Sequence, residues 1–277
     1  MIELPESATL ARQLRETLAG CTIEQAEAGH TPHGFAFYHG DPASYGPLLR
    51  GHTVQDARAV SGMVEVRLDG GVRLLFNDGA NLRYLAPGGK TPEKHQLLLR
   101  LSDGSQLVVT VQMYAGITAF RAGEYDSPYY AAAQQKPSPL GEDFTDLYWQ
   151  SLLAQAKPTL SAKALLATEQ RIPGLGNGVL QDILLRAGIH PRSKLLRLSE
   201  GDRSRLLRSV RETLSAMAAG GGRHTEKDLF GQPGGYATLL SAKSYARPCP
   251  YCGGPITRQA YLGGNVYFCA HCQPLQA

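Results

Sequence analysis

The chain has 277 residues, which is long for one compact domain and typical of two. Its residues are 43% hydrophobic and 19% charged, a composition that supports packed cores and excludes a disordered chain. No run of about eighteen apolar residues occurs, so we expect no transmembrane helix. The first residues, MIELPES, are acidic where a signal peptide needs positive charge, and we therefore expect a cytoplasmic protein.

Charge divides unevenly along the chain, whose formal net charge is +4. Residues 151–277 contain 16 lysines and arginines against 7 acidic residues, which leaves 12 against 17 for residues 1–150. A basic half beside an acidic half is typical of a protein that meets a polyanion, most often nucleic acid. An ordinary solvated surface is the alternative, and the charge alone leaves both interpretations open.

The first half of the chain predicts one helix followed by strands. Residues 8–18 have three leucines on one helical face, with Ser7 as the predicted N-cap. From residue 33 to 120 the pattern changes to short strands between glycine-rich turns, at 63–68, 72–77, 81–85, 96–101 and 105–113. Closely spaced strands with little helix between them indicate an antiparallel sandwich or barrel.

The second half is helical. Residues 123–144 are rich in proline, glycine and polar residues and predict a linker. Apolar residues three or four positions apart then predict helices within 144–156, 161–170, 176–188 and 199–220. The predicted fold class is α+β multidomain, with an antiparallel β-sandwich and a helix over 1–122, the linker over 123–144, a helical domain over 145–240 and a C-terminal hairpin over 241–277.

Four of the five cysteines form two CxxC pairs near the C-terminus, Cys249 with Cys252 and Cys269 with Cys272. The 16 residues between the pairs lie within the range of about 15–20 that zinc ribbons use. Two such turns on one hairpin converge on a tetrahedral metal site, and four protein ligands make that site structural. Two disulfides are the alternative, which a reducing cytosol disfavours. We therefore expect one structural Zn²⁺.

With these features in place, the chain resembles the formamidopyrimidine-DNA glycosylase / endonuclease VIII family. MIELPES is similar to that family's opening Met-Pro-Glu-Leu-Pro-Glu, and RIPGLGNGVLQDILLRAGIHP (171–191) is similar to its helix–two-turns–helix signature. The Cys₄ hairpin is similar to its zinc finger. The resemblance runs nearly end to end and implies a β-sandwich catalytic-type domain, a helix–two-turns–helix DNA-binding domain and a zinc finger.

The resemblance implies base-excision repair of double-stranded DNA that carries a damaged base or an abasic site. In this family the damaged nucleotide is flipped out of the duplex, the N-terminal amine attacks C1′ of its sugar, and a Schiff base permits strand cleavage. Here this implies Met1, Glu3 and Glu6 as catalytic residues, with the carboxylates managing protons at the sugar. Simple charge on the first helical turn is the alternative for Glu3 and Glu6.

The resemblance also implies the DNA-contacting residues, which are His95, Lys163, Gly174, Gly176, Asn177 and Arg223. The glycine turn exposes backbone N–H groups to a phosphate, and Asn177 either donates to that phosphate or caps the next helix. Lys163 lies fourteen residues before Asn177, the spacing of the family's phosphate-contacting lysine; a solvated helix lysine is the alternative. His95 is equally consistent with a structural surface histidine.

Four departures from the family pattern indicate a divergent branch. Ile2 stands where the family has its nucleophilic proline. Because initiator methionine is generally removed only before small residues, we expect Met1 to stay and to hold the amine one residue too far out. The family's hairpin lysine has no counterpart near Gly62, and Gly264 replaces the finger's DNA-contacting arginine.

The fourth departure is the set of Met, Arg and Phe side chains that refills the emptied base stack, which is absent here. Met113 and Tyr114 are either substitute wedges or, as we expect, ordinary strand-core residues. Scaffold motifs are kept while the nucleophile and lesion-probing groups change, which indicates altered lesion choice or altered chemistry.

Three functions follow from these patterns. The first is a DNA glycosylase, with possible AP-lyase activity, in which Glu3 or Glu6 activates a water in preference to Schiff-base chemistry at Met1. The second is a catalytically inactive, damage- or structure-specific DNA-binding protein. The third, an RNA-binding or transcriptional zinc ribbon, does not explain MIELPES. We expect a nucleoid-associated monomer that binds duplex DNA and no membrane; the lesion stays unnamed.

Overall fold

The computed structural model describes residues 1–276 and divides into two compact units. The first unit combines Met1–Gln134 with Gly220–Gly235, and the second combines Gln135–Ala219 with the chain from Tyr236 onward. The glycine-rich segment 220–235 thus belongs to the first unit although it follows the helices of the second. The four predicted domain ranges stay predictions. Among the described residues, no helix is both long and apolar enough to cross a membrane.

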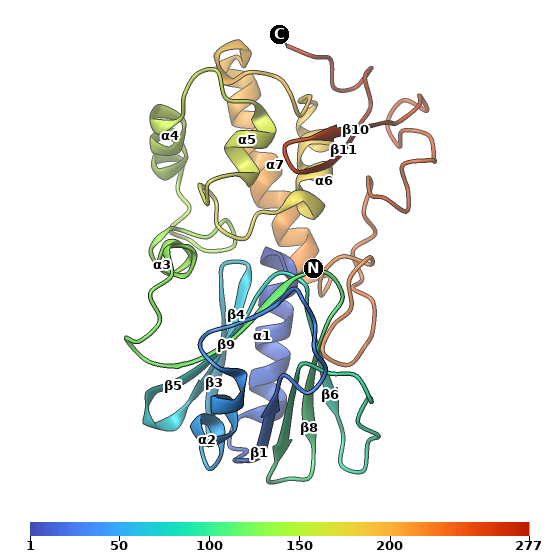
Figure 1. Cartoon of the computed structure of the whole chain (residues 1–277). Coiled ribbons are helices and arrows are strands. Elements are labelled where there is room, and N and C mark those ends of the chain that lie inside the picture. The colour runs from blue at the N-terminus through green and yellow to red at the C-terminus, as the bar shows by residue number, and fades with distance from the viewer. Residues whose placement is uncertain (277) are drawn as a thin grey trace. The chain divides into compact units, whose positions relative to one another are not determined.

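The first unit is a β-sandwich with a helix, as predicted (Figure 1). Its two sheets have the strand orders β1–β7–β8–β6 and β2–β9–β5–β4–β3. The strands are β1 Ile23–Ala28, β2 Ala36–Tyr38, β3 Val54–Val60, β4 Met63–Leu68, β5 Val72–Phe76, β6 Ala80–Leu85, β7 Leu97–Leu101, β8 Gln106–Val111 and β9 Ala115–Arg121. Every pairing is antiparallel except that of β2 with β9, which is parallel.

Helix α1 (Leu4–Leu18) begins earlier than the predicted cap allows. Glu3 is its N-cap and forms a capping box with Glu6, and Pro5 in the first turn has no N–H group to leave unpaired. Ser7 lies buried inside the helix, so its prediction as N-cap is wrong. The helix therefore starts by holding both carboxylates of MIELPES at one buried end.

The core of this unit lies between the two sheets and α1. Leu14 of α1, Phe76 of β5 and Ile117 of β9 are fully buried in one apolar cluster with residues from both sheets. Burying a large apolar side chain contributes about 1.5–3 kcal/mol, so this cluster stabilises the scaffold that holds the start of α1. Two short helices complete the unit, α2 (Tyr45–Leu49) and α3 (Pro128–Gln135), and α3 lies within the segment predicted as a linker.

The second unit contains four helices within the predicted ranges and one hairpin (Figure 1). The helices are α4 Asp146–Gln155, α5 Ala162–Ala167, α6 Asn177–Ala187 and α7 Glu200–Ala219, and the hairpin strands are β10 Thr257–Tyr261 and β11 Gly264–Phe268. Side chains cap α4 at Thr145 and α5 at Ser161, and Gly188 ends α6 in the left-handed conformation. Short 3₁₀ turns occur at η1 Pro42–Ser44, η2 Asp69–Gly71 and η3 Leu195–Arg197.

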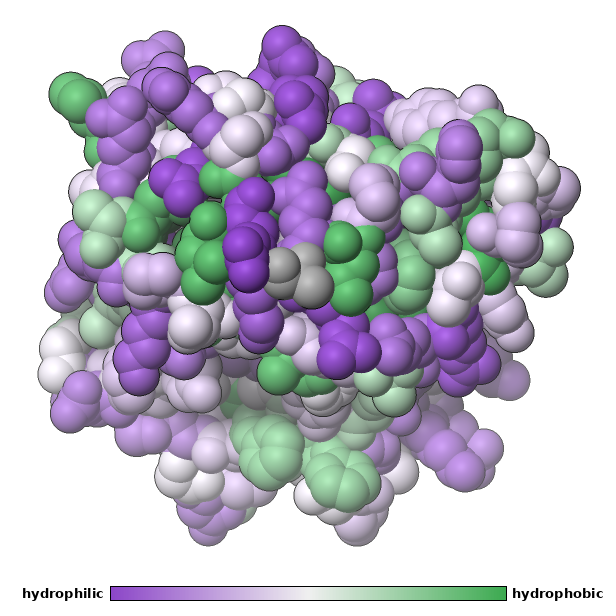
Figure 2. All heavy atoms as spheres, turned by 90° about the horizontal axis from the view of Figure 1, so that it is seen from above, coloured by the Kyte–Doolittle hydropathy of each residue, from purple (hydrophilic) through white to green (hydrophobic). Residues whose placement is uncertain are grey.

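The surface is predominantly polar on the face that Figure 2 shows. Hydrophilic side chains cover most of it, and hydrophobic side chains are dispersed among them. Apolar atoms contribute much of any folded protein's surface, so scattered groups of this kind need no partner to explain them.

Candidate functional site

A buried ionic cluster lies at the start of α1. Arg223, from the segment 220–235, donates from Nε to Glu6 Oε1 at 3.0 Å and from Nη2 to Glu6 Oε2 at 2.8 Å. Its backbone N–H donates to Glu6 Oε1 at 3.0 Å, and its Nη1 lies 3.5 Å from Glu3 Oε2. All three side chains are at most 5% exposed. The cluster therefore pairs one guanidinium with both predicted catalytic carboxylates inside the protein.

The charged form of Arg223 is stabilised by this arrangement. Burial opposes its charge, but the nearby carboxylates Glu3 and Glu6 outweigh that effect and raise the pKa of Arg223. Its guanidinium is 3% exposed, so a DNA contact would require it to leave Glu6. The prediction that Arg223 contacts DNA stays a prediction, which this burial does not favour.

The loop that carries Arg223 depends on glycine. A Cβ atom added at Gly234 would lie 2.3 Å from the carbonyl atoms of Gly222, so two stretches of the loop approach too closely for any side chain. Gly222 itself has a φ of +98°. The unusual glycine content of 220–236 thus brings Arg223 back to Glu6, 217 positions away in the sequence.

The two carboxylates differ in how closely they meet Arg223. Glu6 accepts three N–H groups of Arg223 and, at 3.3 Å, the backbone N–H of Glu3. Glu3 lies 3.5 Å from Nη1 of Arg223, and its side chain accepts the backbone N–H of Glu6 in the capping box. Partial burial, followed by the charges of Asp78 and Glu3, raises the pKa of Tyr114. Arg223 therefore holds Glu6 more closely than Glu3.

A cavity of about 250 Å³ opens beside this cluster. Its volume is just below the range of about 300–1,000 Å³ typical of small-molecule sites. Met1, Ile2 and Glu6 line it, together with 79–83, Gln112, Met113 and 225–227. Met1 and Glu6 are predicted catalytic residues, and Met113 is one of the two candidate wedges. The structure therefore brings these separate parts of the first unit to one cavity.

The amino group of Met1 pairs with Glu226 at the exposed rim of this cavity. The backbone N–H of Ile2 donates to the carbonyl of Asp78 at 2.6 Å, which fixes the start of the chain. Burial raises the pKa of Asp78, and the amino terminus partly offsets that effect. Sequence reasoning missed Glu226 and Asp78, because no spacing links either residue to Met1.

Met113 and Tyr114 are not strand-core residues, and the expectation that they are is wrong. They lie between the end of β8 and the start of β9, and they are 62% and 40% exposed. The backbone of Tyr114 is held by Gly79, whose N–H donates to its carbonyl at 3.0 Å. Met113 also lines the cavity, so a large apolar side chain projects beside it.

In the second unit, Lys163 and Asn177 meet at the turn between β10 and β11. Lys163 of α5 is 2% exposed and donates from Nζ to the carbonyl of Tyr261 at 2.6 Å. Burial lowers the pKa of Lys163. Asn177 donates from Nδ2 to the carbonyl of Asn265 at 2.8 Å, and a Cβ at Gly264 would lie 3.4 Å from that Nδ2. Lys163 is therefore not the solvated helix lysine of the alternative interpretation.

Asn177 does not cap α6. The N-cap is Gly176, which provides no side chain, and Asn177 is the first residue of the helix. Its Oδ1 is buried without a hydrogen-bond partner among the described residues. Gly174 has a φ of +77°, so glycine suits the preceding turn. The capping interpretation is wrong. The ammonium of Lys163 and the side-chain amide of Asn177 both donate to the backbone of the β10–β11 hairpin.

His95 lies in the first unit, shortly before β7. It is 4% exposed, so it is not the surface histidine of the alternative interpretation. Its role as a phosphate contact stays a prediction.

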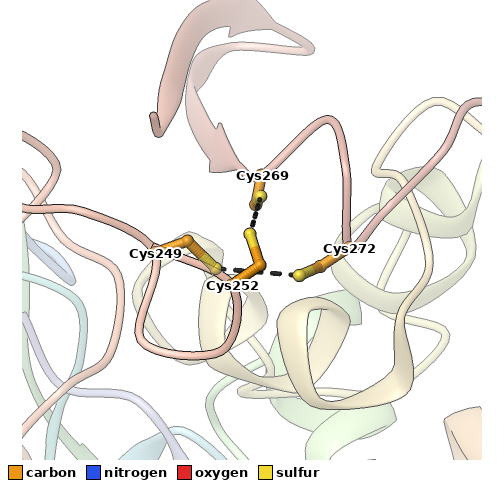
Figure 3. Close-up of side chains that lie close together, drawn as sticks. All are labelled: Cys249, Cys252, Cys269 and Cys272. Atoms are coloured by element: carbon orange, nitrogen blue, oxygen red, sulfur yellow. Dashed lines mark hydrogen bonds between the residues drawn. The ribbon is translucent and has the colours of Figure 1, made fainter. Parts of the chain in front are cut away.

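The four cysteines of the C-terminal pairs converge, as Figure 3 shows. The Sγ atoms of Cys249 and Cys272 are 3.8 Å apart, and those of Cys252 and Cys269 are 3.5 Å apart. Disulfide sulfurs lie about 2.05 Å apart, whereas four sulfurs about 2.3 Å from a tetrahedral ion lie about 3.8 Å from one another. The cluster fits a metal ion and not two disulfides.

Electrostatics at the cluster agree with a cation. Burial, followed by the neighbouring thiols, raises the pKa of Cys272, so four thiolates coexist there only when a cation neutralises them. Gln273 accepts the backbone N–H of Cys269 at 3.0 Å and donates to the carbonyl of Ile189 at 2.9 Å, which ties the cluster to the end of α6. The arrangement can hold one ion with every position filled by sulfur.

Comparison with known proteins gives one consistent answer, although no family model matches the chain. The chain is 29% identical over 285 residues to a formamidopyrimidine-DNA glycosylase of Thermus thermophilus, an alignment that covers 99% of this chain and 98% of that relative. It is 27% identical over 280 residues to the formamidopyrimidine-DNA glycosylase of Bacillus subtilis, covering 99% of each.

Solved structures agree with these relatives. The crystal structure of the MutM (Fpg) protein from Thermus thermophilus superposes with a TM-score of 0.81 at 26% identity and covers 99% of each chain. The wild-type Lactococcus lactis Fpg (MutM), in complex with DNA containing N7-benzyl-Fapy-dG, superposes with a TM-score of 0.82 at 25% identity and covers 98% of this chain and 99% of that one. The similarity thus spans both units.

Proposed function

We propose that the chain, which is similar over nearly its whole length to formamidopyrimidine-DNA glycosylases, belongs to the formamidopyrimidine-DNA glycosylase / endonuclease VIII family and is a DNA glycosylase of base-excision repair that acts on damaged bases in duplex DNA. The observation that carries the proposal is the cavity beside α1. Met1, Glu6, the segment 79–83 and the loop residues 225–227 come from distant parts of the sequence and line it together. A flipped nucleotide needs a pocket of this kind next to its reacting groups.

The chemistry we propose is hydrolytic. A water attacks C1′ of the flipped nucleotide, the bond from C1′ to the base breaks, and the leaving base takes up a proton from solvent. A carboxylate at the start of α1, Glu3 or Glu6, accepts the proton that the water loses, and Glu6 lines the cavity. Glu6 also accepts three N–H groups of Arg223, which orient that end of α1.

The pairing of Met1 with Glu226 supports this route over Schiff-base formation. The Met1 amine is held in contact with the Glu226 carboxylate and must leave that contact before it can attack C1′. AP-lyase activity through Met1 is therefore expected to be weak. The exposed Met113 and Tyr114 are suited to the role of wedges in the emptied base stack.

We further propose that DNA phosphates bind at Lys163, Gly174, Gly176 and Asn177, and that the Cys₄ cluster holds one structural Zn²⁺. Lys163 is a buried ammonium that donates to a carbonyl, so a phosphate oxygen would supply the opposite charge. When bound, zinc supplies folding energy to the β10–β11 hairpin, whose Tyr261 and Asn265 carbonyls accept hydrogen bonds from Lys163 and Asn177.

The experiment is a panel of duplexes that carry an oxidised purine, an oxidised pyrimidine or an abasic site, with base release measured and borohydride used to trap Schiff bases. We expect base release without efficient trapping, and a loss of about 10²-fold or more in Glu3→Gln or in Glu6→Gln. Glu226→Gln is the matched control, because it frees the Met1 amine without touching Glu3. Efficient trapping of the unaltered protein would overturn the hydrolytic route. Tight DNA binding without release from any duplex would instead favour the inactive DNA-binding alternative.

A further inference from the structure

A second group of potential metal ligands lies in the first unit, far along the sequence from the cysteines. Glu27 of β1, His30 in the turn that follows and His95 before β7 each offer one ligand atom, and these atoms all lie within 4.8 Å of one another. His30 Nδ1 is 2.8 Å from Glu27 Oε1, and His95 Nε2 is 3.9 Å from Glu27 Oε2. Neither the ionic cluster nor the proposed phosphate turn uses them, and of the three only His95 is also a predicted DNA contact.

Backbone hydrogen bonds hold this group in place. The pairing of β1 with β7 continues beyond the strands, because the N–H of Gly29 donates to the carbonyl of Gln96 at 2.8 Å and the N–H of Thr31 donates to that of His95 at 3.0 Å. The N–H of His95 donates in return to the hydroxyl of Thr31 at 3.2 Å. The turn that carries His30 is thus joined to the backbone of His95.

The buried ring of His95 is oriented as a metal ligand is. Its Nδ1 lies 3.0 Å from the carbonyl of Pro92, and since a carbonyl only accepts, Nδ1 carries the proton. A neutral ring in that tautomer has its lone pair on Nε2. This atom is buried, in a side chain 4% exposed, and has no hydrogen-bond partner among the described residues. A backbone carbonyl behind a histidine fixes the ligating tautomer in the same way at many metal sites.

We propose that Glu27, His30 and His95 bind one divalent transition-metal ion of the class of Zn²⁺, Co²⁺ or Ni²⁺. Two imidazoles and a carboxylate are donors that these ions accept, at bond lengths of about 2.0–2.2 Å. Ligand atoms around a tetrahedral ion of that size lie about 3.4 Å apart, between the 2.8 Å and 3.9 Å observed here. Three protein ligands leave a further position for water.

The two exposed ligands can make the remaining adjustment. The ring of His30 is stacked on that of His95, with centroids 4.3 Å apart and planes 3° from parallel, so His30 must rotate to direct its lone pair at a shared ion. The side chains of His30 and Glu27 are 44% and 54% exposed, which leaves them free to turn, whereas His95 is the fixed anchor. The alternative is an ion pair between protonated His95 and Glu27, which requires no metal.

The test is a titration of the full chain, with its cysteine site loaded with Zn²⁺, by Co²⁺ followed in visible absorption and by Zn²⁺ followed in calorimetry. We expect one further equivalent of metal, whose cobalt spectrum lacks the thiolate-to-metal charge transfer of a cysteine site. Glu27→Gln and His30→Ala should each weaken this binding by about tenfold or more, and His95→Ala should abolish it. His33→Ala, at a partly exposed histidine three positions from His30, should leave it unchanged.

Each other outcome overturns the proposal. Absence of a further equivalent favours the ion pair of His95 with Glu27. A further equivalent that survives in Glu27→Gln and His30→Ala, or that falls equally in His33→Ala, reveals adventitious binding to surface histidines. Because the Glu27 and His30 side chains are largely exposed, those two variants keep the core intact and decide the question even where His95→Ala destabilises the fold.

Discussion

The two units each bury a cationic side chain, but the two cations have different kinds of partner. In the first unit Arg223 is surrounded by the carboxylates of Glu3 and Glu6, so its charge is met within the protein. In the second unit the ammonium of Lys163 donates to the carbonyl of Tyr261, which is a neutral partner. The first cation has its counterions inside the protein, and the second is suited to an external anion.

This difference predicts that Arg223 positions parts of the protein, whereas Lys163 binds DNA. A buried ion pair costs desolvation energy that its partners must offset, and breaking it leaves an uncompensated charge. Arg223 therefore orders the beginning of α1 and the loop 220–235, and its removal should harm the fold before it harms DNA binding. Lys163 has only a carbonyl to offset its charge, so its removal should harm binding and leave the fold intact. Four experiments test this contrast.

The largest effect is expected from Cys269→Ser, which removes one ligand of the cluster that supports the turn around Lys163. Structural zinc contributes an apparent folding energy of about 10–16 kcal/mol in zinc-finger peptides, more than a short hairpin gains from packing. We expect loss of the metal, disorder of 249–272 and weak DNA binding, with the first unit still folded. Metal analysis, amide hydrogen exchange and a binding titration measure these three results. Native protein that contains no zinc would contradict the assignment.

The next effect is expected from Arg223→Met. Removing one partner of a buried ion pair typically destabilises a protein by about 3–5 kcal/mol, because Glu3 and Glu6 would be left buried without their cation. Urea denaturation measures the loss, and Lys227→Met, at an exposed lysine of the same loop, is the control. Adding Glu6→Gln should restore part of the stability. Equal stability of Arg223→Met and the unaltered protein would show that the ion pair is not formed.

A smaller effect is expected from Lys163→Met. A hydrogen bond to a charged group contributes about 1.5–3 kcal/mol, so the affinity for duplex DNA should fall about ten- to a hundredfold. The slope of log K against log salt should become shallower by about 0.9, because one phosphate contact is lost. Fluorescence anisotropy across a salt series measures both, with Lys157→Met as the exposed control. An unchanged slope would remove Lys163 from the phosphate site.

The smallest effect is the pH dependence of stability that Lys163 causes. Burial lowers its pKa in the folded chain below the ordinary 10.5. Between the folded and the unfolded pKa the unfolded chain binds more protons, so the free energy of unfolding rises with pH there, by at most about 1.4 kcal/mol per unit. Relative to Lys163→Met, the unaltered protein should gain stability as pH rises toward 10.5. Parallel urea curves at each pH would refute this sign.

Sequence patterns predicted what depends on short spacing. The CxxC pairs predicted the thiol cluster, and the strands β4 to β8 and helices α4 to α7 lie where alternation and helical periodicity placed them. These signals work because neighbouring residues determine the local geometry. The predicted N-cap of α1, Ser7, was wrong because the helix begins earlier, at the capping box of Glu3 and Glu6.

Contacts between distant residues could not be predicted in this way. Arg223 meets Glu6 across 217 positions, and Glu226 meets the amine of Met1 across 225, with no periodicity to indicate either contact. Tyr114 was expected in the core because its neighbours alternate as a strand, but the chain turns there between β8 and β9. Burial at Lys163 depends on a hairpin almost one hundred residues later, since Tyr261 lies 98 positions away. The contacts of Arg223, Glu226 and Lys163 could therefore be identified only from the folded structure.

The division of the first unit into Met1–Gln134 and Gly220–Gly235 has a consequence for how the protein is made. A ribosome that has released the β-sandwich must still synthesise all of 135–219 before Arg223 emerges, on the order of ten seconds at about 5–20 residues per second. During that interval Glu3 and Glu6 have no cation from the loop beside them. The nascent sandwich therefore keeps an uncompensated acidic end until the segment 220–235 has been synthesised.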